Sequence, residues 1–166
     1  MLDGLFVTPA VTAITEALAA TKATGVVAVV GHAKLAAALA AAREVVPVAL
    51  SARAARKLPS AIPALTSVEP SSLAAVIGVD LATDADWEVT IRGWARVVRD
   101  GGTIVFVDRG HVHEASRRAL CGGLTEIEQR HAGRAVITSG LVSHLGTSLQ
   151  EEASRTVSGS RAQRPG

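Results

Sequence analysis

The residues best suited to chemistry lie in the second half of the chain. His111, His113 and Glu114 fall within four positions, and histidines beside a carboxylate are a combination that binds zinc. In a strand the two histidines would share a face, but at the start of a helix, which we expect here, they diverge. His131 and His144 are distant in sequence. We therefore expect no metal site.

Two aspartates each follow an apolar run, where a strand end can present a carboxylate to a ligand. Asp80 can equally be a loop or N-cap carboxylate, and Asp108 can form an ion pair with Arg109. Cys121 is the only cysteine, and its place between a helix and two glycines favours a small buried side chain over a nucleophile. No nucleotide-binding or hydrolase motif occurs.

The elements that must position these residues are clearest in the middle of the chain. The apolar runs 73–79 and 103–107 indicate strands buried on both faces. Between them, apolar residues at helical spacing form one stripe: Trp87, Ile91, Trp94, Ala95 and Val98. Asp84 or Asp86 can cap this helix, and Asp100-Gly101-Gly102 is expected to end it. A strand, a crossover helix and a second strand predict a parallel sheet covered by helices on both sides.

The rest of the chain extends this pattern into an α/β fold, a three-layer Rossmann-like sandwich. We predict helices at 9–22, 32–44, 51–58 and 111–120, and strands at 26–30, 45–50, 124–131 and 135–141. The strand at 26–30 is expected to be the most central. Pro47 needs an unpaired or bulged position, and the proline-rich segment 59–70 is a loop with one weak strand at 64–68. A short turn at 132–134 predicts that the sheet ends in an antiparallel hairpin.

Composition excludes several classes of function. The chain is 48% hydrophobic but only 2% aromatic, and the helix stripe uses both tryptophans, so no platform for stacking bases remains. Its net charge of +2 comes from scattered arginines, so we expect no nucleic-acid partner. No run approaches the ~20 apolar residues of a membrane span. We expect a cytoplasmic protein with no membrane contact, one domain at 1–146 and a disordered tail at 147–166.

Two segments carry a resemblance to a known family. The sequences DWEVTIRGWARVVRDGGTIVFVD (86–108) and GLTEIEQRHAGRAVITSG (123–140) resemble the helix, fifth strand and final hairpin of class I S-adenosylmethionine-dependent methyltransferases. The similarity covers about Thr24 to Leu141. It implies the strand order 3-2-1-4-5-7-6, with the seventh strand antiparallel. These motifs support the fold and do not bind the cofactor.

The cofactor motif departs from the family pattern. The family has a Gly-x-Gly-x-Gly turn after the first strand, where this chain has only Gly31, followed by His32, Ala33 and Lys34. We expect the side chains of His32 and Lys34 to occupy or overhang the site. The family also has an acidic residue after the second strand, where this chain has Ala49 or Leu50. Each lost charge-assisted hydrogen bond costs about 1.5–3 kcal/mol, which is at least ~tenfold in affinity.

The resemblance and its departures together imply a non-catalytic, methyltransferase-like pseudoenzyme that serves as an interaction or scaffold domain. It would bind no S-adenosylmethionine and would act through a protein partner or as a homo-oligomer. The alternative is a small-molecule methyltransferase with an atypical cofactor turn. In that case Gly31, His32, Ala33 and Asp80 would contact S-adenosylmethionine. A third possibility is a regulator that senses a metabolite at this place without converting it.

Overall fold

The computed structural model describes residues 4–144, and the predicted tail at 147–166 lies outside them. Side chains are described from Val7 onward. The elements in chain order are α1 (Gly4–Ala20), β1 (Val27–Val30), α2 (Ala33–Ala40), β2 (Val45–Val48), α3 (Ala52–Ala55), η1 (Leu65–Ser67), β3 (Leu73–Val79), η2 (Leu81–Thr83), α4 (Trp87–Val97), β4 (Val98–Arg109), α5 (Val112–Cys121), β5 (Thr125–Ala132) and β6 (Ala135–Leu141).

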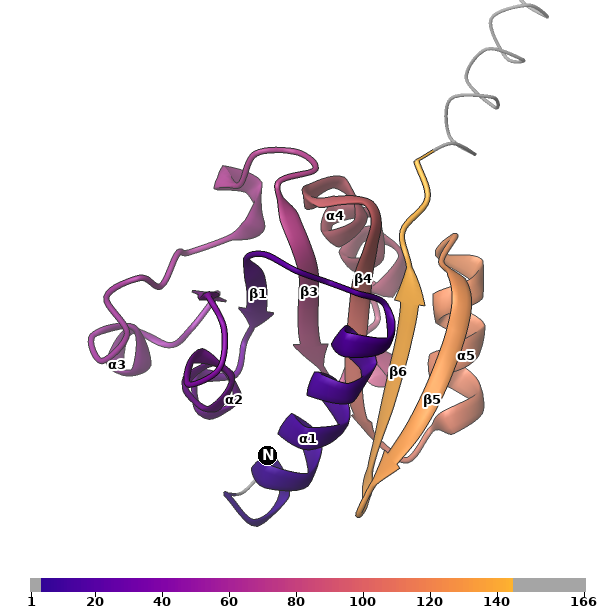
Figure 1. Cartoon of the computed structure of the whole chain (residues 1–166), viewed down its shortest axis with the longest axis horizontal. Coiled ribbons are helices and arrows are strands. Elements are labelled where there is room, and N and C mark those ends of the chain that lie inside the picture. Colours follow the sequence, from indigo (N-terminus) through magenta and orange to yellow (C-terminus); the bar gives the residue numbers. More distant parts are fainter. Residues whose placement is uncertain (1–3, 145–166) are drawn as a thin grey trace, which may run out of the picture.

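The strands form one sheet in the order β2-β1-β3-β4-β6-β5. β1 to β4 are parallel, and β6 pairs antiparallel with both β4 and β5. The helices α1 and α2 pack on one face, while α4 and α5 pack on the other (Figure 1). The predicted mostly parallel, three-layer sandwich with a terminal hairpin is therefore confirmed.

The central strands are buried on both faces, as their unbroken apolar runs predicted. Along β4, Val105 and Val107 pack with α1 and α2, whereas Ile104 and Phe106 pack with α4 and α5. All four side chains are at most 1% exposed. Adjacent residues of a strand point to opposite faces, so a fully covered strand has no polar positions.

The sheet lacks the strand that was expected at 64–68. Leu65–Ser67 is instead a 3-10 turn, and only a single parallel bridge, between Val48 and Ile62, lies beside β2. Prolines at 59, 63 and 70 remove backbone donors that a strand would need. The segment is also held by Arg96, whose Nη2 donates to the carbonyls of Leu65 and Val68 at 2.9 and 3.2 Å. β1 is consequently second from the edge and not central.

Pro47 occupies the unpaired position that its missing N–H requires. Its carbonyl accepts a 2.9 Å hydrogen bond from the Ile62 amide, and Ala49 N–H donates to the Ile62 carbonyl at 3.0 Å. The backbone nitrogen and carbonyl of Pro47 therefore lie on the side of β2 that faces away from β1. A proline there protects the sheet edge from pairing with another strand.

Several helix boundaries differ from those predicted: α2 ends at Ala40 and not at 44, and α3 ends at Ala55 and not at 58. α1 spans Gly4–Ala20 and not 9–22, so Pro9 lies inside the helix. It ends early because Lys22 adopts a left-handed conformation and the Ala23 amide bonds back to the Leu18 carbonyl at 2.9 Å. α4 ends at Val97, and the predicted glycine turn is part of β4: Gly101 N–H donates to the Val142 carbonyl, which keeps this stretch in the sheet.

Candidate functional site

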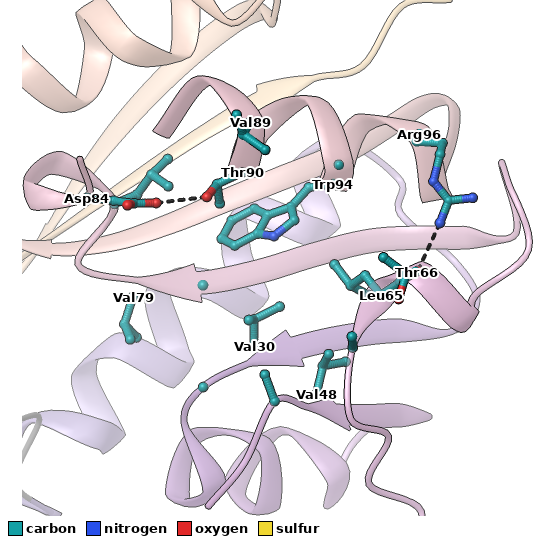
Figure 2. A pocket seen from close by; sticks show the side chains of 16 residues that line it. Val30, Val48, Leu65, Thr66, Val79, Asp84, Val89, Thr90, Trp94 and Arg96 are labelled. Carbon is teal, nitrogen blue, oxygen red and sulfur yellow. Dashed lines mark hydrogen bonds between the residues drawn. The ribbon is translucent and has the colours of Figure 1, made fainter. Parts of the chain in front are cut away.

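A cavity of about 530 Å³ lies where β1, β2 and β3 end, beneath α4 (Figure 2). Its walls are mostly apolar, and the polar side chains in its lining are Thr66, Asp84, Thr90 and Arg96. Carboxyl ends of parallel strands at a reversal of strand order are the usual ligand-binding place in such sheets. This cavity is therefore the candidate site.

Gly31 directly follows β1 and lines the cavity. Its φ is +73°, which favours glycine, and a Cβ there would meet no atom within 4 Å. The next residue, His32, is the N-cap of α2, and its Nδ1 accepts a 3.1 Å hydrogen bond from the Leu35 amide. The histidine is thus engaged with the helix that follows the turn.

The expectation that His32 and Lys34 overhang this site is wrong. Neither residue lines the cavity. Ala33 and Lys34 line a separate hollow of about 480 Å³ between α2 and α3, together with Arg53 and Lys57. The sequence did not reveal this because a histidine after a glycine turn can cap a helix as readily as fill a cleft.

The end of β2 offers the cavity no acidic group. Ala49 lines the cavity, is exposed, and has a left-handed φ of +53°. Non-glycine residues rarely adopt this conformation, and aspartate and asparagine do so more readily than alanine. The position therefore presents a methyl group where the family resemblance implies a carboxylate.

The α4 helix forms the roof of the cavity with one stripe of residues, Val89, Gly93 and Arg96, at i, i+4 and i+7. Beside this stripe the indole of Trp94 lies against β3. A Cβ on Gly78 would come within 2.0 Å of the Trp94 ring, so only glycine permits this close approach. Sequence reasoning assigned Trp94 to the core stripe and missed that it also lines a cavity.

Two polar groups mark different parts of the lining, on opposite sides of Trp94 in Figure 2. The Asp84 carboxylate accepts 2.9 and 2.8 Å hydrogen bonds from the Asp86 amide and the Thr90 hydroxyl, and so holds the start of α4. Asp86 precedes α4 but its side chain makes no capping bond. At the other end of α4, Arg96 donates through Nη2 to the carbonyls of Leu65 and Val68.

Asp80 and Asp108, the two strand-end aspartates, lie outside the cavity lining. Asp80 is exposed and left-handed, with φ of +57°. Asp108 is 2% exposed, its Oδ1 accepts a 2.7 Å hydrogen bond from the Ala82 amide, and its Oδ2 is buried without a hydrogen-bond partner among residues 4–144. Burial raises the pKa of the Asp108 carboxyl, and the nearby Asp80 charge acts in the same direction.

The histidine-rich segment forms no metal site in the described part of the chain. Hydrogen bonds from Arg117 and Arg118 lower the pKa of the Glu114 carboxyl to about 2, so this carboxylate serves ion pairs within α5. His111 and His113 are exposed. Cys121 is exposed as well, and the prediction that it is buried is wrong, because it lies at the solvent-facing end of α5.

Arg118 fastens α5 to the loop that precedes α4. Its Nη1 donates to the carbonyls of Leu81 and Asp84 at 2.7 and 2.5 Å, and its guanidinium lies 5.6 Å from the centre of the Trp87 ring. Leu81 and Asp84 both line the cavity. One wall of the site is therefore held from a neighbouring helix, which no sequence motif indicated.

Comparison with known proteins identifies the fold. No family model and no curated protein matches the chain. Among solved structures, a protein assigned as an S-adenosyl-L-methionine-dependent methyltransferase from Methanococcus maripaludis has a TM-score of 0.65 at 9% identity, over 86% of this chain and 89% of that one. The methyltransferase complexed with the Haloferax volcanii Trm112 activator has a TM-score of 0.60 at 13% identity, over 72% and 83%.

A third structure is a Thermus thermophilus 16S rRNA methyltransferase bound to S-adenosylmethionine and guanosine, with a TM-score of 0.54 at 14% identity. The match covers 72% of this chain but only 36% of that enzyme. The likenesses show a class I methyltransferase-like fold. The strand order closely matches the implied one, with its third strand reduced to the Val48–Ile62 bridge. No helix among residues 4–144 is long and apolar enough to cross a membrane.

Proposed function

We propose that this chain, which has the fold of the class I methyltransferases, is a non-catalytic interaction or scaffold domain that does not bind S-adenosylmethionine. The observation that carries the proposal is the chemistry of the cavity lining. S-adenosylmethionine presents an ammonium, a carboxylate and two ribose hydroxyls, and each needs a polar partner when buried. Ala49 stands at the end of β2, where the family resemblance implies a carboxylate that would accept hydrogen bonds from the ribose hydroxyls.

The remaining polar side chains are a poor substitute. Asp84 is the only carboxylate in the lining, and each of its oxygens already accepts a hydrogen bond. Asp80 is not in the lining. An unpaired buried charge costs several kcal/mol, which exceeds what a typical small-ligand site gains from one contact. The fit of this cavity to the cofactor is therefore weak.

An interaction role is supported by exposed apolar side chains. Val89 on α4 is 68% exposed and Leu120 on α5 is 60% exposed, and these are the large exposed hydrophobic residues of the described chain. The Haloferax protein of the same fold is bound to an activator protein. A protein partner or a second copy of this chain would cover such residues. We further propose that the protein is cytoplasmic and has no nucleic-acid partner, since its described surface carries scattered arginines.

Calorimetry with S-adenosylmethionine and S-adenosylhomocysteine tests the proposal. We expect no saturable heat at ligand concentrations up to about 1 mM. A dissociation constant tighter than ~100 µM for either ligand would overturn the proposal, because a site without the expected polar contacts cannot reach that affinity. Size-exclusion chromatography with light scattering separates a homo-oligomer from a monomer that awaits another partner.

One observation favours a second candidate, a methyltransferase with an atypical cofactor turn. The cavity reaches Gly31 and is not filled by His32, so a ligand could approach the backbone there. In that case the Gly31, His32 and Ala33 backbone and Asp80 would replace the missing motif residues. Transfer of a labelled methyl group to any small molecule would support this candidate, and the calorimetry above would then also show binding.

A further inference from the structure

The cavity has a feature that the proposed function does not use, namely an apolar channel kept open by a glycine in the middle of α4. Gly93 lines the cavity, is exposed, and would have open space around a Cβ. Glycine inside a helix costs about 1 kcal/mol relative to alanine. Nothing in the packing requires it, in contrast to Gly78, where Trp94 leaves no room.

Apolar residues from several elements line the cavity together with Gly93. Val89 lies one turn before Gly93 on the same stripe, and Val30, Val48 and Leu65 line the cavity from the ends of β1 and β2 and from η1 (Figure 2). Val30 and Leu65 are only partly buried although they pack against the core. Side chains of this kind gain free energy when a ligand covers them.

The charged side chains in the lining, Asp84 and Arg96, would determine how a ligand is oriented in the cavity. The Arg96 guanidinium lies at one end of the stripe, and among the described residues its Nε and Nη1 make no hydrogen bond. Asp84, which precedes α4 at the other end of the stripe, already accepts a hydrogen bond on each carboxylate oxygen. An anion is attracted to the Arg96 end and repelled from the Asp84 end, and Nε or Nη1 can donate a charge-assisted hydrogen bond to a carboxylate oxygen.

We infer that this cavity binds an apolar carboxylic acid, with its chain along the Val89–Gly93 stripe and its carboxylate on Arg96. The volume of about 530 Å³ is in the range of small-molecule sites and suits a medium-length chain or an aryl acid in free, monomeric form. The inference rests on the proposed absence of S-adenosylmethionine from this edge of the sheet.

Titration of the full-length protein with monomeric decanoate, followed by the fluorescence of its two tryptophans, tests the inference. Decanoate is expected to saturate, and decyltrimethylammonium, which has the same chain and the opposite charge, is expected to bind at least ~tenfold more weakly. Gly93→Leu should abolish decanoate binding by filling the channel while the protein remains folded, because the helix gains a better helix former in open space. Arg92→Gln, on the same helix but outside the lining, is the matched control and should bind as the wild type does.

Charge reversal separates recognition from a merely structural role of Arg96, which also holds the 65–68 segment. Arg96→Lys should keep the preference for decanoate, whereas Arg96→Glu should prefer decyltrimethylammonium. Equal binding of both amphiphiles by the wild type, or decanoate binding unchanged in Gly93→Leu, would overturn the inference. Binding of S-adenosylmethionine would contradict the proposed function, while the decanoate titration alone decides the ligand class of the cavity.

Discussion

At the scale of single residues, the buried Asp108 carboxylate is the most unusual group in the structure. It is satisfied on one oxygen by the Ala82 amide and has no hydrogen-bond partner on the other within residues 4–144. Burial raises its pKa above the ordinary 3.8. The folded state therefore holds the proton more tightly than the unfolded chain does, so the contribution of Asp108 to stability is fully present below pH 3.8 and is lost as pH rises through the folded pKa.

Asp108→Asn should remove this pH dependence. We expect the free energy of unfolding of the wild type, relative to the variant, to fall between about pH 4 and neutral pH, by about 1.4 kcal/mol for each unit by which the folded pKa exceeds the unfolded one. Urea denaturation of both proteins across this range measures the difference. A difference that is flat or rises with pH would contradict the raised pKa.

Arg117 and Arg118 provide a matched pair for the wall of the cavity. Arg118→Met should destabilise the protein by about 1–3 kcal/mol, because the partly buried carbonyls of Leu81 and Asp84 each lose a charged donor. Arg117→Met removes an exposed ion pair with Glu114 and a contact of the guanidinium with the Trp87 ring at 5.8 Å, and should cost less than about 1 kcal/mol. Equal effects in chemical denaturation would show that Arg118 does not hold this wall.

At the scale of elements, the middle of the chain could be predicted closely and the proline-rich segment could not. Leu73–Val79 and the helix at Trp87 follow directly from apolar runs and helical spacing. The segment at 59–70 has neither signal, and its shape depends on Arg96 and on the Ile62 bridge, which are contacts distant in sequence. The cavity could not be predicted from the sequence either. Its lining includes residues of β1, η1 and α4, which are far apart in the sequence and meet only after folding.

The two glycines that frame Trp94 should respond to alanine with opposite signs. Gly93→Ala should stabilise the protein by about 0.5–1 kcal/mol, because its Cβ meets open space in a helix. Gly78→Ala should destabilise it by about 1–3 kcal/mol, because its Cβ would lie 2.0 Å from the Trp94 ring. Thermal unfolding with circular dichroism reports both changes. Changes of the same sign would mean that Trp94 is not packed on β3 as described.

Unlike the fold, the cofactor contacts of Gly31, His32, Ala33 and Asp80 stay a prediction. Of these four residues only Gly31 lines the cavity. A motif places residues along the backbone, whereas capping, a left-handed turn or burial decides where each side chain goes. A glycine in the middle of a helix, such as Gly93, is unfavourable for the helix itself. Its presence could have indicated that the space beside the helix is open.

At the scale of the whole molecule, two apolar layers on either face of one sheet hold the domain together. Among the residues whose side chains are described, 7–144, the buried members lie between Ala10 and Val142, which is within the predicted domain at 1–146. Removal of residues 147–166 should therefore change the free energy of unfolding by less than about 0.5 kcal/mol. A loss above about 1 kcal/mol in urea denaturation would extend the domain into that segment.

The central claim is that a methyltransferase-like scaffold is present here without a site for its cofactor. Amide chemical shifts of isotope-labelled protein, recorded while S-adenosylhomocysteine is added to about 1 mM, test it most directly because they report both binding and place. We predict that the amides of Gly31, Ala49 and Asp80 do not shift. Saturable shifts of these amides with a dissociation constant below ~100 µM would contradict the account.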